Sequence, residues 1–235
     1  MAEFTMAIAG FSVGVCSLFA STKDYCKDYL TQEAPQFTLS VTEDELLAEQ
    51  RFLDEEADQE GLRRRVFGKP FLERNFLQRR IAALLLPHGV LLLHGSAVAL
   101  EGKGYLFTAA CGTGKSTHTR LWRQEFAGAE AINDDKPFLR RTPQGWLLCG
   151  SPWMGKHGVG SNLTVPLAGI CVLERGDEDR IEAISSHDQI LAGLCSHQPD
   201  LVADLLANTP LWLLHCTPNP SAAHVAHAAM AQGNS

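Results

Sequence analysis

Residues 105–116 read YLFTAACGTGKS, and this stretch decides the fold of the chain. Its apolar start predicts a strand, its glycine-containing centre predicts a loop, and the residues after Lys115 predict a helix that ends near Phe126. A strand, a glycine-containing loop, Lys-Ser and a helix, in that order, are the context that a phosphate-binding loop requires. A glycine-rich turn before an ordinary helix accounts less well for these features together.

The residue types in this loop suit phosphate chemistry. Glycines let backbone N–H groups turn inward around phosphate oxygens, and the following helix directs its positive end at the same oxygens. Lys115 supplies a charge for the β- and γ-phosphates, and the Ser116 hydroxyl is a ligand for Mg²⁺. Ala109 stands where the usual pattern has its first glycine, so either the loop needs no positive φ there or it is slightly remodelled. The residues expected to bind nucleotide are Cys111, Gly112, Thr113, Gly114, Lys115, Ser116 and Thr117.

Two adjacent carboxylates follow a short apolar strand beyond the loop, in Asn133-Asp134-Asp135-Lys136. One carboxylate at the end of a strand beside a phosphate loop can hold Mg²⁺, and the other can accept a proton from an attacking hydroxyl. A cation between the two would relieve their repulsion. By itself the segment is typical of a surface Asn-Asp turn, but its position after the phosphate loop favours a functional role.

Two further polar segments accompany these motifs. His94 lies between two apolar runs, where it could hydrogen-bond a phosphate, orient Asp134, or be a buried histidine with partners of its own. Lys156 lies in the polar loop PWMGKH at 152–157, where it could neutralise charge on a transferring phosphate or be an exposed loop lysine. The residues alone leave these alternatives open.

Composition and charge narrow the functional class. The chain has 235 residues, of which 45% are hydrophobic and 20% charged, and its net charge is -7. This length suffices for one α/β domain with a sizeable core, and the acidity gives no general reason to bind nucleic acid or an anionic membrane. The seven cysteines include no C-x-x-C pair, which argues against a disulfide framework or a zinc site. The apolar run at 6–20 is shorter than the ~20 residues of a membrane span, so a cytoplasmic location is expected.

The remaining segments indicate two regions. Residues 6–19 predict one strand, and the charged residues 54–65 predict a loop or an exposed segment. Thr42 and Glu45 form a capping box that begins a short helix. The other expected elements are helices at 70–86, 190–194, 201–207 and 222–230, and strands at 90–93, 97–100, 105–108, 131–132, 137–139, 146–148, 167–173, 180–184 and 211–214. We therefore expect a small α+β region at 1–87 and an α/β core rich in antiparallel strands at 88–235.

Four segments occur in a fixed order: HGS at 94–96, CGTGKSTH at 111–118, NDDK at 133–136 and GSPWMGKH at 150–157. Together they resemble the HPr kinase family and, more broadly, the kinases related to it and to ATP-dependent phosphoenolpyruvate carboxykinase. The resemblance covers about residues 90–175. It implies a P-loop kinase core with a mixed, largely antiparallel sheet that uses ATP and Mg²⁺.

The resemblance also implies a role for each matching residue. His94 corresponds to the family's histidine before the loop, and Lys115 and Ser116 correspond to its phosphate and metal residues. Asp134 corresponds to the residue proposed as base, and Asp135 to its metal-side partner. An exchange of the last two roles is the alternative.

The sequence departs from the family in several places. Cys111 stands where Ser is common, and Ala109 stands where Gly is common. The glycine-rich signature that serves dephosphorylation in true HPr kinases has no counterpart, and the N-terminal region does not resemble their regulatory domain. These departures indicate a small variant without that domain, and they argue against HPr itself as the substrate.

The chain is thus expected to be an ATP- and Mg²⁺-dependent kinase that transfers the γ-phosphate to a hydroxyl of a peptide, a protein serine or a small molecule. The expected catalytic residues are Asp134, His94, Lys115 and Lys156. One alternative is a carboxykinase-like enzyme, against which the length and the lack of an evident arginine cluster argue. The other is a non-catalytic protein that senses ATP. Neither nucleic acid nor a membrane is an expected partner, and the resemblance allows a homo-oligomer, which no feature of the sequence demonstrates.

Overall fold

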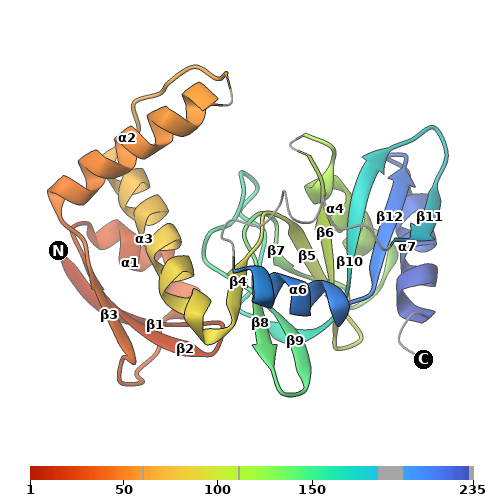
Figure 1. The fold of residues 1–235 in the computed structure, drawn as a ribbon, viewed down its shortest axis with the longest axis horizontal. Helices are drawn as coiled ribbons and strands as arrows, with labels where there is room; N and C mark the ends of the chain where they lie inside the picture. The colour runs from red at the N-terminus through yellow and green to blue at the C-terminus, as the bar shows by residue number, and fades with distance from the viewer. Residues whose placement is uncertain (60, 111, 185–197, 233–235) are drawn as a thin grey trace. The chain divides into compact units, whose positions relative to one another are not determined.

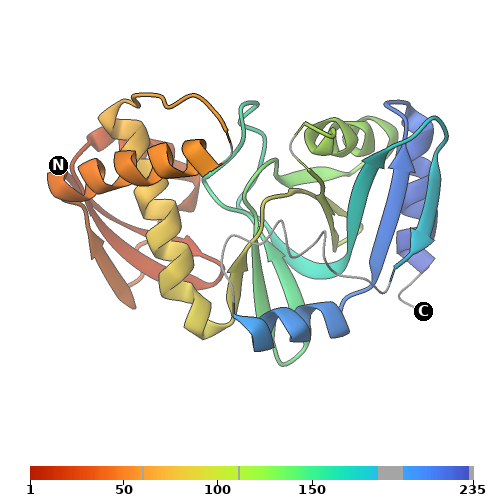
Figure 2. The same ribbon diagram turned by 45° about the horizontal axis from the view of Figure 1, so that its top comes forward.

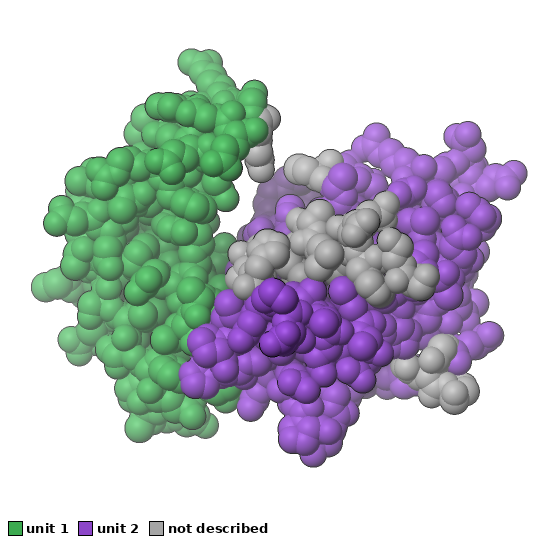
Figure 3. Space-filling view, in the orientation of Figure 1, with its two compact units in different colours: residues 1–84 green, residues 85–235 purple. Residues whose placement is uncertain are grey.

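The structure is a computed structural model, and it describes residues 1–59, 61–110, 112–184 and 198–232. The chain divides into two compact units, Met1–Leu84 and Leu85–Ser235, which are coloured separately in Figure 3. Within the described residues, no helix has both the length and the apolar character that a membrane crossing demands. The two units are described in turn.

The first unit contains a three-stranded sheet in the order β1-β2-β3 (Figure 1). Strands β1 (Ala2–Ile8) and β2 (Phe11–Ser17) are antiparallel, and β3 (Phe37–Ser40) lies parallel to β2. The single strand expected here is wrong, because Ala9 and Gly10 turn the chain with φ angles of 48° and 77°. Two residues with positive φ are the signature of a tight hairpin turn, and this turn interrupts an otherwise continuous apolar pattern.

Helices complete the first unit. They are α1 (Ala20–Tyr25), the 3₁₀ helix η1 (Lys27–Tyr29), α2 (Glu43–Gln59) and α3 (Lys69–Leu85). The capping box at the start of α2 is confirmed: the Thr42 N–H donates to Glu45 Oε2 at 2.8 Å, and the Glu45 N–H donates to Thr42 Oγ1 at 3.3 Å. Residues 54–59 are exposed or half-exposed but belong to α2, so a loop is wrong up to Gln59, because acidic residues facing solvent do not end a helix.

Helices α2 and α3 are joined through a buried carboxylate. Glu49 on α2 is 1% exposed, and its Oε2 accepts a hydrogen bond from Arg79 Nη2 at 2.6 Å. The Arg79 guanidinium also lies 3.7 Å from the centre of the Phe52 ring. The carboxylate is therefore compensated by a charge and by packing, as a buried ion requires.

The second unit is built on a mixed sheet. Its path is β4-β8-β9-β10-β6-β5-β7, and β12 pairs with β10 and β11. The strands are β4 (Val90–Leu92), β5 (Ser96–Leu100), β6 (Lys103–Thr108), β7 (Glu130–Asn133), β8 (Phe138–Thr142), β9 (Gly145–Cys149), β10 (Thr164–Arg175), β11 (Arg180–Ala183) and β12 (Leu211–Cys216), with η2 (Leu86–His88) before them. Strand β10 is parallel to β6 and β12, whereas the other pairs are antiparallel.

Helices cover both faces of this sheet. Figure 2 shows α4 (Lys115–Glu125) and α6 (Pro199–Ala207) on opposite sides, and α7 (Pro220–Gln232) packs beside α4. Successive side chains of β6 face the two cores on opposite sides of the sheet. Leu106 packs in the cluster with α6, while Phe107 packs in the cluster with Trp122 of α4. The unit is thus a mixed α/β structure. The helix expected at 190–194 lies outside the described residues.

Candidate active site

The loop between β6 and α4 adopts the backbone that its glycines permit. Gly112 has a φ of 77° and Gly114 a φ of 125°, a region that side chains disfavour. Ala109 is not among the described residues with positive φ, so the loop has no need of glycine at that position. Cys111, which was expected to bind nucleotide, lies outside the described residues.

Donors gather at the centre of this loop. The Lys115 ammonium donates to the Ala109 carbonyl oxygen at 3.1 Å, so the side chain reaches across the loop, and Lys115 is only 8% exposed. Helix α4 begins after Gly114 with no side-chain cap, which leaves the N–H groups of its first turn for another acceptor. The Lys115 ammonium and these N–H groups together form an anion site of the kind that helix N-termini provide. Thr113, Ser116 and Thr117 are half-buried around it.

Asp134 is a buried carboxylate at the end of β7. It is 6% exposed, its Oδ1 accepts the Gly155 N–H at 2.7 Å, and its Oδ2 is buried with no hydrogen-bond partner among the described residues. Burial raises the pKa of Asp134 and outweighs the opposite effect of the backbone N–H groups of Gly155 and Val159. A carboxylate oxygen in this state is a strong acceptor for a proton or a cation.

Asp135 has the opposite electrostatic character. Its Oδ1 lies 3.1 Å from His94 Nε2. Burial acts to raise the pKa of Asp135, but the His94 hydrogen bond and the charges of Lys136 and Lys115 prevail, so that the pKa is lowered. The expectation that His94 might orient Asp134 is wrong, because the histidine ring faces the neighbouring carboxylate.

Asn133 holds the acidic turn against two other segments. Its side-chain oxygen accepts the N–H groups of Asp135 at 2.8 Å and Lys136 at 2.6 Å. Its amide nitrogen donates to the carbonyl oxygens of Ser151 at 2.9 Å and Trp153 at 3.3 Å. Asn133 is fully buried, so all of these bonds are shielded from water. Sequence reasoning assigned no role to Asn133, although it directly precedes the acidic pair.

The segment at 94–96 docks on the same turn. The Gly95 N–H donates to the Asp135 carbonyl oxygen at 2.9 Å, and the Ser96 hydroxyl donates to the Asp134 carbonyl oxygen at 2.9 Å. A Cβ on Gly95 would lie 2.9 Å from the Phe107 carbonyl oxygen, so only glycine allows this close approach. Segments at 94–96, 133–136 and 151–155 therefore meet beside the phosphate loop.

Replacement of Asn133 by alanine should lower the free energy of unfolding by about 3 kcal/mol or more, since each buried group left without a partner costs ~1–3 kcal/mol. Chemical denaturation followed by tryptophan fluorescence will measure this loss. The fluorescence reports on the second unit, which contains the tryptophans Trp122, Trp146, Trp153 and Trp212. Asn208→Ala is the matched control, because Asn208 is exposed, and it should cost less than about 1 kcal/mol. Equal losses in the two variants would contradict the bridging role of Asn133.

Lys156 lies beside the site without lining it. Its side chain is exposed, while the adjacent His157 lines a cavity of about 380 Å³ next to the phosphate loop. The other residues around this cavity are Ser116, Thr117, Thr119, Arg120, Arg123, Asp134 and Val159. Sequence reasoning missed Arg120 and Arg123. Their spacing of three residues on the helix that begins at Lys115 would have placed them on one helix face.

A second cavity, of about 520 Å³, lies on the other side of the loop. Gly112–Gly114 line it together with residues at and beyond the ends of β10 and β12, among them Arg175, Asp177 and Thr217. Arg175 Nη2 donates to the Gly112 carbonyl oxygen at 2.6 Å, which ties the end of β10 to the loop. Strands β6, β10 and β12 are parallel, so their carboxyl ends meet at this edge of the sheet.

The oxygen donors beside the loop match the chemistry of Mg²⁺. The Ser116 hydroxyl lies 3.5 Å from the Asp134 carbonyl oxygen, and the buried Asp134 Oδ2 has no partner among the described residues. Mg²⁺ typically takes one or two protein carboxylates and completes its shell with waters and substrate phosphates. The Ser116 hydroxyl and the Asp135 carboxylate, which the sequence predicts as the metal residues, are oxygen ligands of this type.

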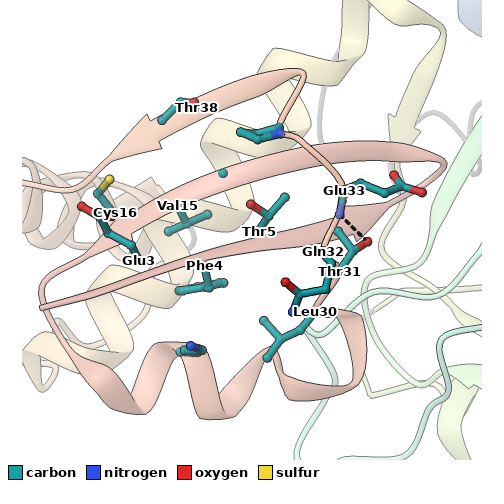
Figure 4. A pocket seen from close by; sticks show the side chains of 13 residues that line it. Glu3, Phe4, Thr5, Val15, Cys16, Leu30, Thr31, Gln32, Glu33 and Thr38 are labelled. Atoms are coloured by element: carbon teal, nitrogen blue, oxygen red, sulfur yellow. Dashed lines mark hydrogen bonds between the residues drawn. The ribbon is translucent and has the colours of Figure 1, made fainter.

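The first unit has a cavity of its own. It measures about 460 Å³ and lies between the β1–β2 hairpin and residues 30–38 (Figure 4). Phe4, Val15 and Leu30 give it an apolar part, and Glu33 gives it a charged edge. All the residues that line it belong to the first unit.

Comparison with known proteins gives a limited likeness. No model of a known protein family matches the sequence, and no curated protein matches it. Among solved structures, the chain is similar to one described as the Hpr(Ser) kinase/phosphatase from Coxiella burnetii. The TM-score is 0.41 and the identity 12%, with 61% of this chain and 99% of that chain covered. At these values the argument for function must come from the residues of the site.

Proposed function

We propose that this protein is an ATP- and Mg²⁺-dependent kinase that transfers the γ-phosphate to a hydroxyl group. One observation carries the proposal: Asp134, a buried carboxylate, lines the same cavity as Ser116 of the phosphate loop. The proposal includes an HPr kinase-type P-loop core at residues 88–235, with the region 1–87 as an addition to it. The acceptor is a serine of a peptide or protein, or a small hydroxyl compound.

The phosphate loop would bind the triphosphate of ATP. Backbone N–H groups of Gly112, Gly114 and the first turn of α4 would supply donors for its oxygens, and Thr117 follows them on the helix. Lys115 would move its ammonium from the Ala109 carbonyl to the β- and γ-phosphates, a short displacement because the side chain already crosses the loop. Mg²⁺ bound to Ser116 and Asp135 would neutralise charge on the same phosphates.

Asp134 would act as the base. The acceptor oxygen forms a bond to the γ-phosphorus, the bond from that phosphorus to the β–γ bridging oxygen breaks, and ADP leaves. The proton of the hydroxyl passes to Asp134, whose burial and raised pKa suit a proton acceptor. His94 keeps Asp135 ionised and in place, so we regard it as a positioning residue. Lys156, exposed at the rim, would add positive charge near the transferring phosphate.

Calorimetry and phosphate transfer test the proposal together. The protein should bind ATP in the presence of Mg²⁺, and incubation with γ-labelled ATP and a fractionated cell extract should place the label on a hydroxyl. Failure to bind ATP with Mg²⁺ would sink the proposal. Binding without transfer to any fraction would favour an ATP-sensing protein, and decarboxylation of oxaloacetate with ATP would favour a carboxykinase-like enzyme.

A further inference from the structure

The two cavities beside the phosphate loop lie on different faces of helix α4. Ser116, Arg120 and Arg123 line the first cavity, His118 and Leu121 line the second, and Thr117 borders both. At 3.6 residues per turn, positions 116, 120 and 123 share one face, whereas 114, 118 and 121 lie on the other. A nucleotide held at the start of this helix therefore has a separate cavity on each side.

The position of Asp134 distinguishes the two cavities. In-line transfer needs the acceptor oxygen and the leaving ADP on opposite sides of the γ-phosphorus. Asp134 lines the first cavity, so the acceptor hydroxyl belongs there, next to the oxygen that takes its proton. The nucleoside then belongs in the second cavity, between Gly112–Gly114 and Arg175.

Arg120 and Arg123 bring positive charge to the first cavity, in which the acceptor is placed. Both side chains are exposed, and neither forms an ion pair with any described residue. In contrast, Arg141 in the same unit is paired with Asp204 at 2.9 Å. The two arginines lie about 6 Å and about 10 Å along the helix axis from Ser116. A guanidinium presents a planar fork of donors that matches the oxygens of a carboxylate or a phosphate.

We propose that the acceptor carries an oxyanion, a carboxylate or a phosphate, within about two helical turns of its reacting hydroxyl, and that Arg120 and Arg123 bind this group. The inference rests on the proposed kinase function and specifies its substrate class. The oxyanion takes no part in bond making: the hydroxyl oxygen gains the phosphoryl group, Asp134 takes the proton and ADP leaves. Neutral hydroxyl compounds of the same size would bind less tightly, because they offer no charge to the arginine pair.

Linked analogues of ATP test this inference without knowledge of the natural acceptor. In each of three conjugates, a short serine-derived arm would be attached to the γ-phosphate. The arm would end in a carboxylate in the first conjugate, in a phosphate in the second and in a neutral amide in the third. Their affinities, with Mg²⁺ at fixed ionic strength, would be measured by calorimetry for the wild type and for Arg120→Gln/Arg123→Gln. The matched control is Arg63→Gln/Arg65→Gln, which removes the same charge from exposed residues of the first unit.

The wild type and the control should bind at least one anionic conjugate roughly tenfold to a hundredfold more tightly than the amide, as expected for charge-assisted hydrogen bonds. Arg120→Gln/Arg123→Gln should lose this preference and keep its affinity for ATP itself. The preferred conjugate identifies the oxyanion as carboxylate or phosphate. Equal binding of all three conjugates by the wild type would overturn the inference, as would an equal loss of ATP affinity in the variant. Failure of the wild type to bind ATP would instead refute the kinase function.

Discussion

Asparagine in place of Asp134 should leave the affinity for ATP with Mg²⁺ near the wild-type value and slow phosphate transfer by about 10²–10⁴-fold. The amide has the shape of the carboxylate, and its oxygen can still accept the Gly155 N–H that Asp134 accepts at 2.7 Å. It cannot take the proton of the acceptor hydroxyl. The effect is therefore expected on the rate of transfer and not on nucleotide binding.

Calorimetry and single-turnover transfer will separate these two quantities, and Asp135→Asn is the matched control. That variant should require more Mg²⁺, because Asp135 is the expected metal ligand, and the His94 hydrogen bond and the nearby Lys115 charge help to lower its pKa. A wild-type transfer rate for Asp134→Asn at saturating Mg²⁺ would exclude Asp134 as the base. If the two variants exchange their behaviours, the chemistry stands and the roles of the two carboxylates are reversed.

Alanine in place of Lys115 should weaken the binding of ATP and reduce turnover by about 10²–10³-fold, the typical cost of losing one charged donor to a transferring group. The ammonium lies within the loop, 3.1 Å from the Ala109 carbonyl oxygen, and its charge contributes to the lowered pKa of Asp135. Its loss should therefore affect both the phosphates and the neighbouring carboxylate.

Lys103→Ala provides the control for this measurement. Lys103 is exposed at the start of β6, the strand that leads into the phosphate loop, and it should behave like the wild type in ATP calorimetry and in transfer. Equal ATP affinity and activity in Lys115→Ala and the wild type would contradict the assignment of the loop. Lys115→Ala is expected to fold, since the Lys115 side chain is not part of an apolar core cluster. A thermal unfolding temperature near that of the wild type would verify this.

Local sequence determined the secondary structure around the site. The order of strand, glycine loop and helix at 105–126 fixed β6 and α4, because glycine at positive φ and the apolar periodicity act over a few neighbouring residues. The capping box at Thr42 marked the start of α2 for the same reason. Where an apolar pattern ran on across Ala9 and Gly10, the same local reasoning missed a hairpin.

The candidate residues were also named from sequence, since Lys-Ser after glycine and adjacent carboxylates are recognisable as residue types. Their roles in catalysis stay predictions. What the sequence could not supply is which side chains meet. His94 faces Asp135 and not Asp134, and Lys156 stands outside the cavity that His157 lines.

Tertiary structure alone decided the partners of the acidic turn. Asn133 joins residues 134–136 to residues 151–153 through hydrogen bonds, and Gly95 fits there because a Cβ would meet the Phe107 carbonyl. Arg120 and Arg123 of α4 likewise become candidates for substrate binding only because Asp134, which follows β7, lines the same cavity. Such contacts join segments far apart in the chain, and they depend on the pairing of β5 with both β6 and β7. Propensity and periodicity act over neighbouring residues, so they specify each element, while long-range packing specifies which side chains share a site.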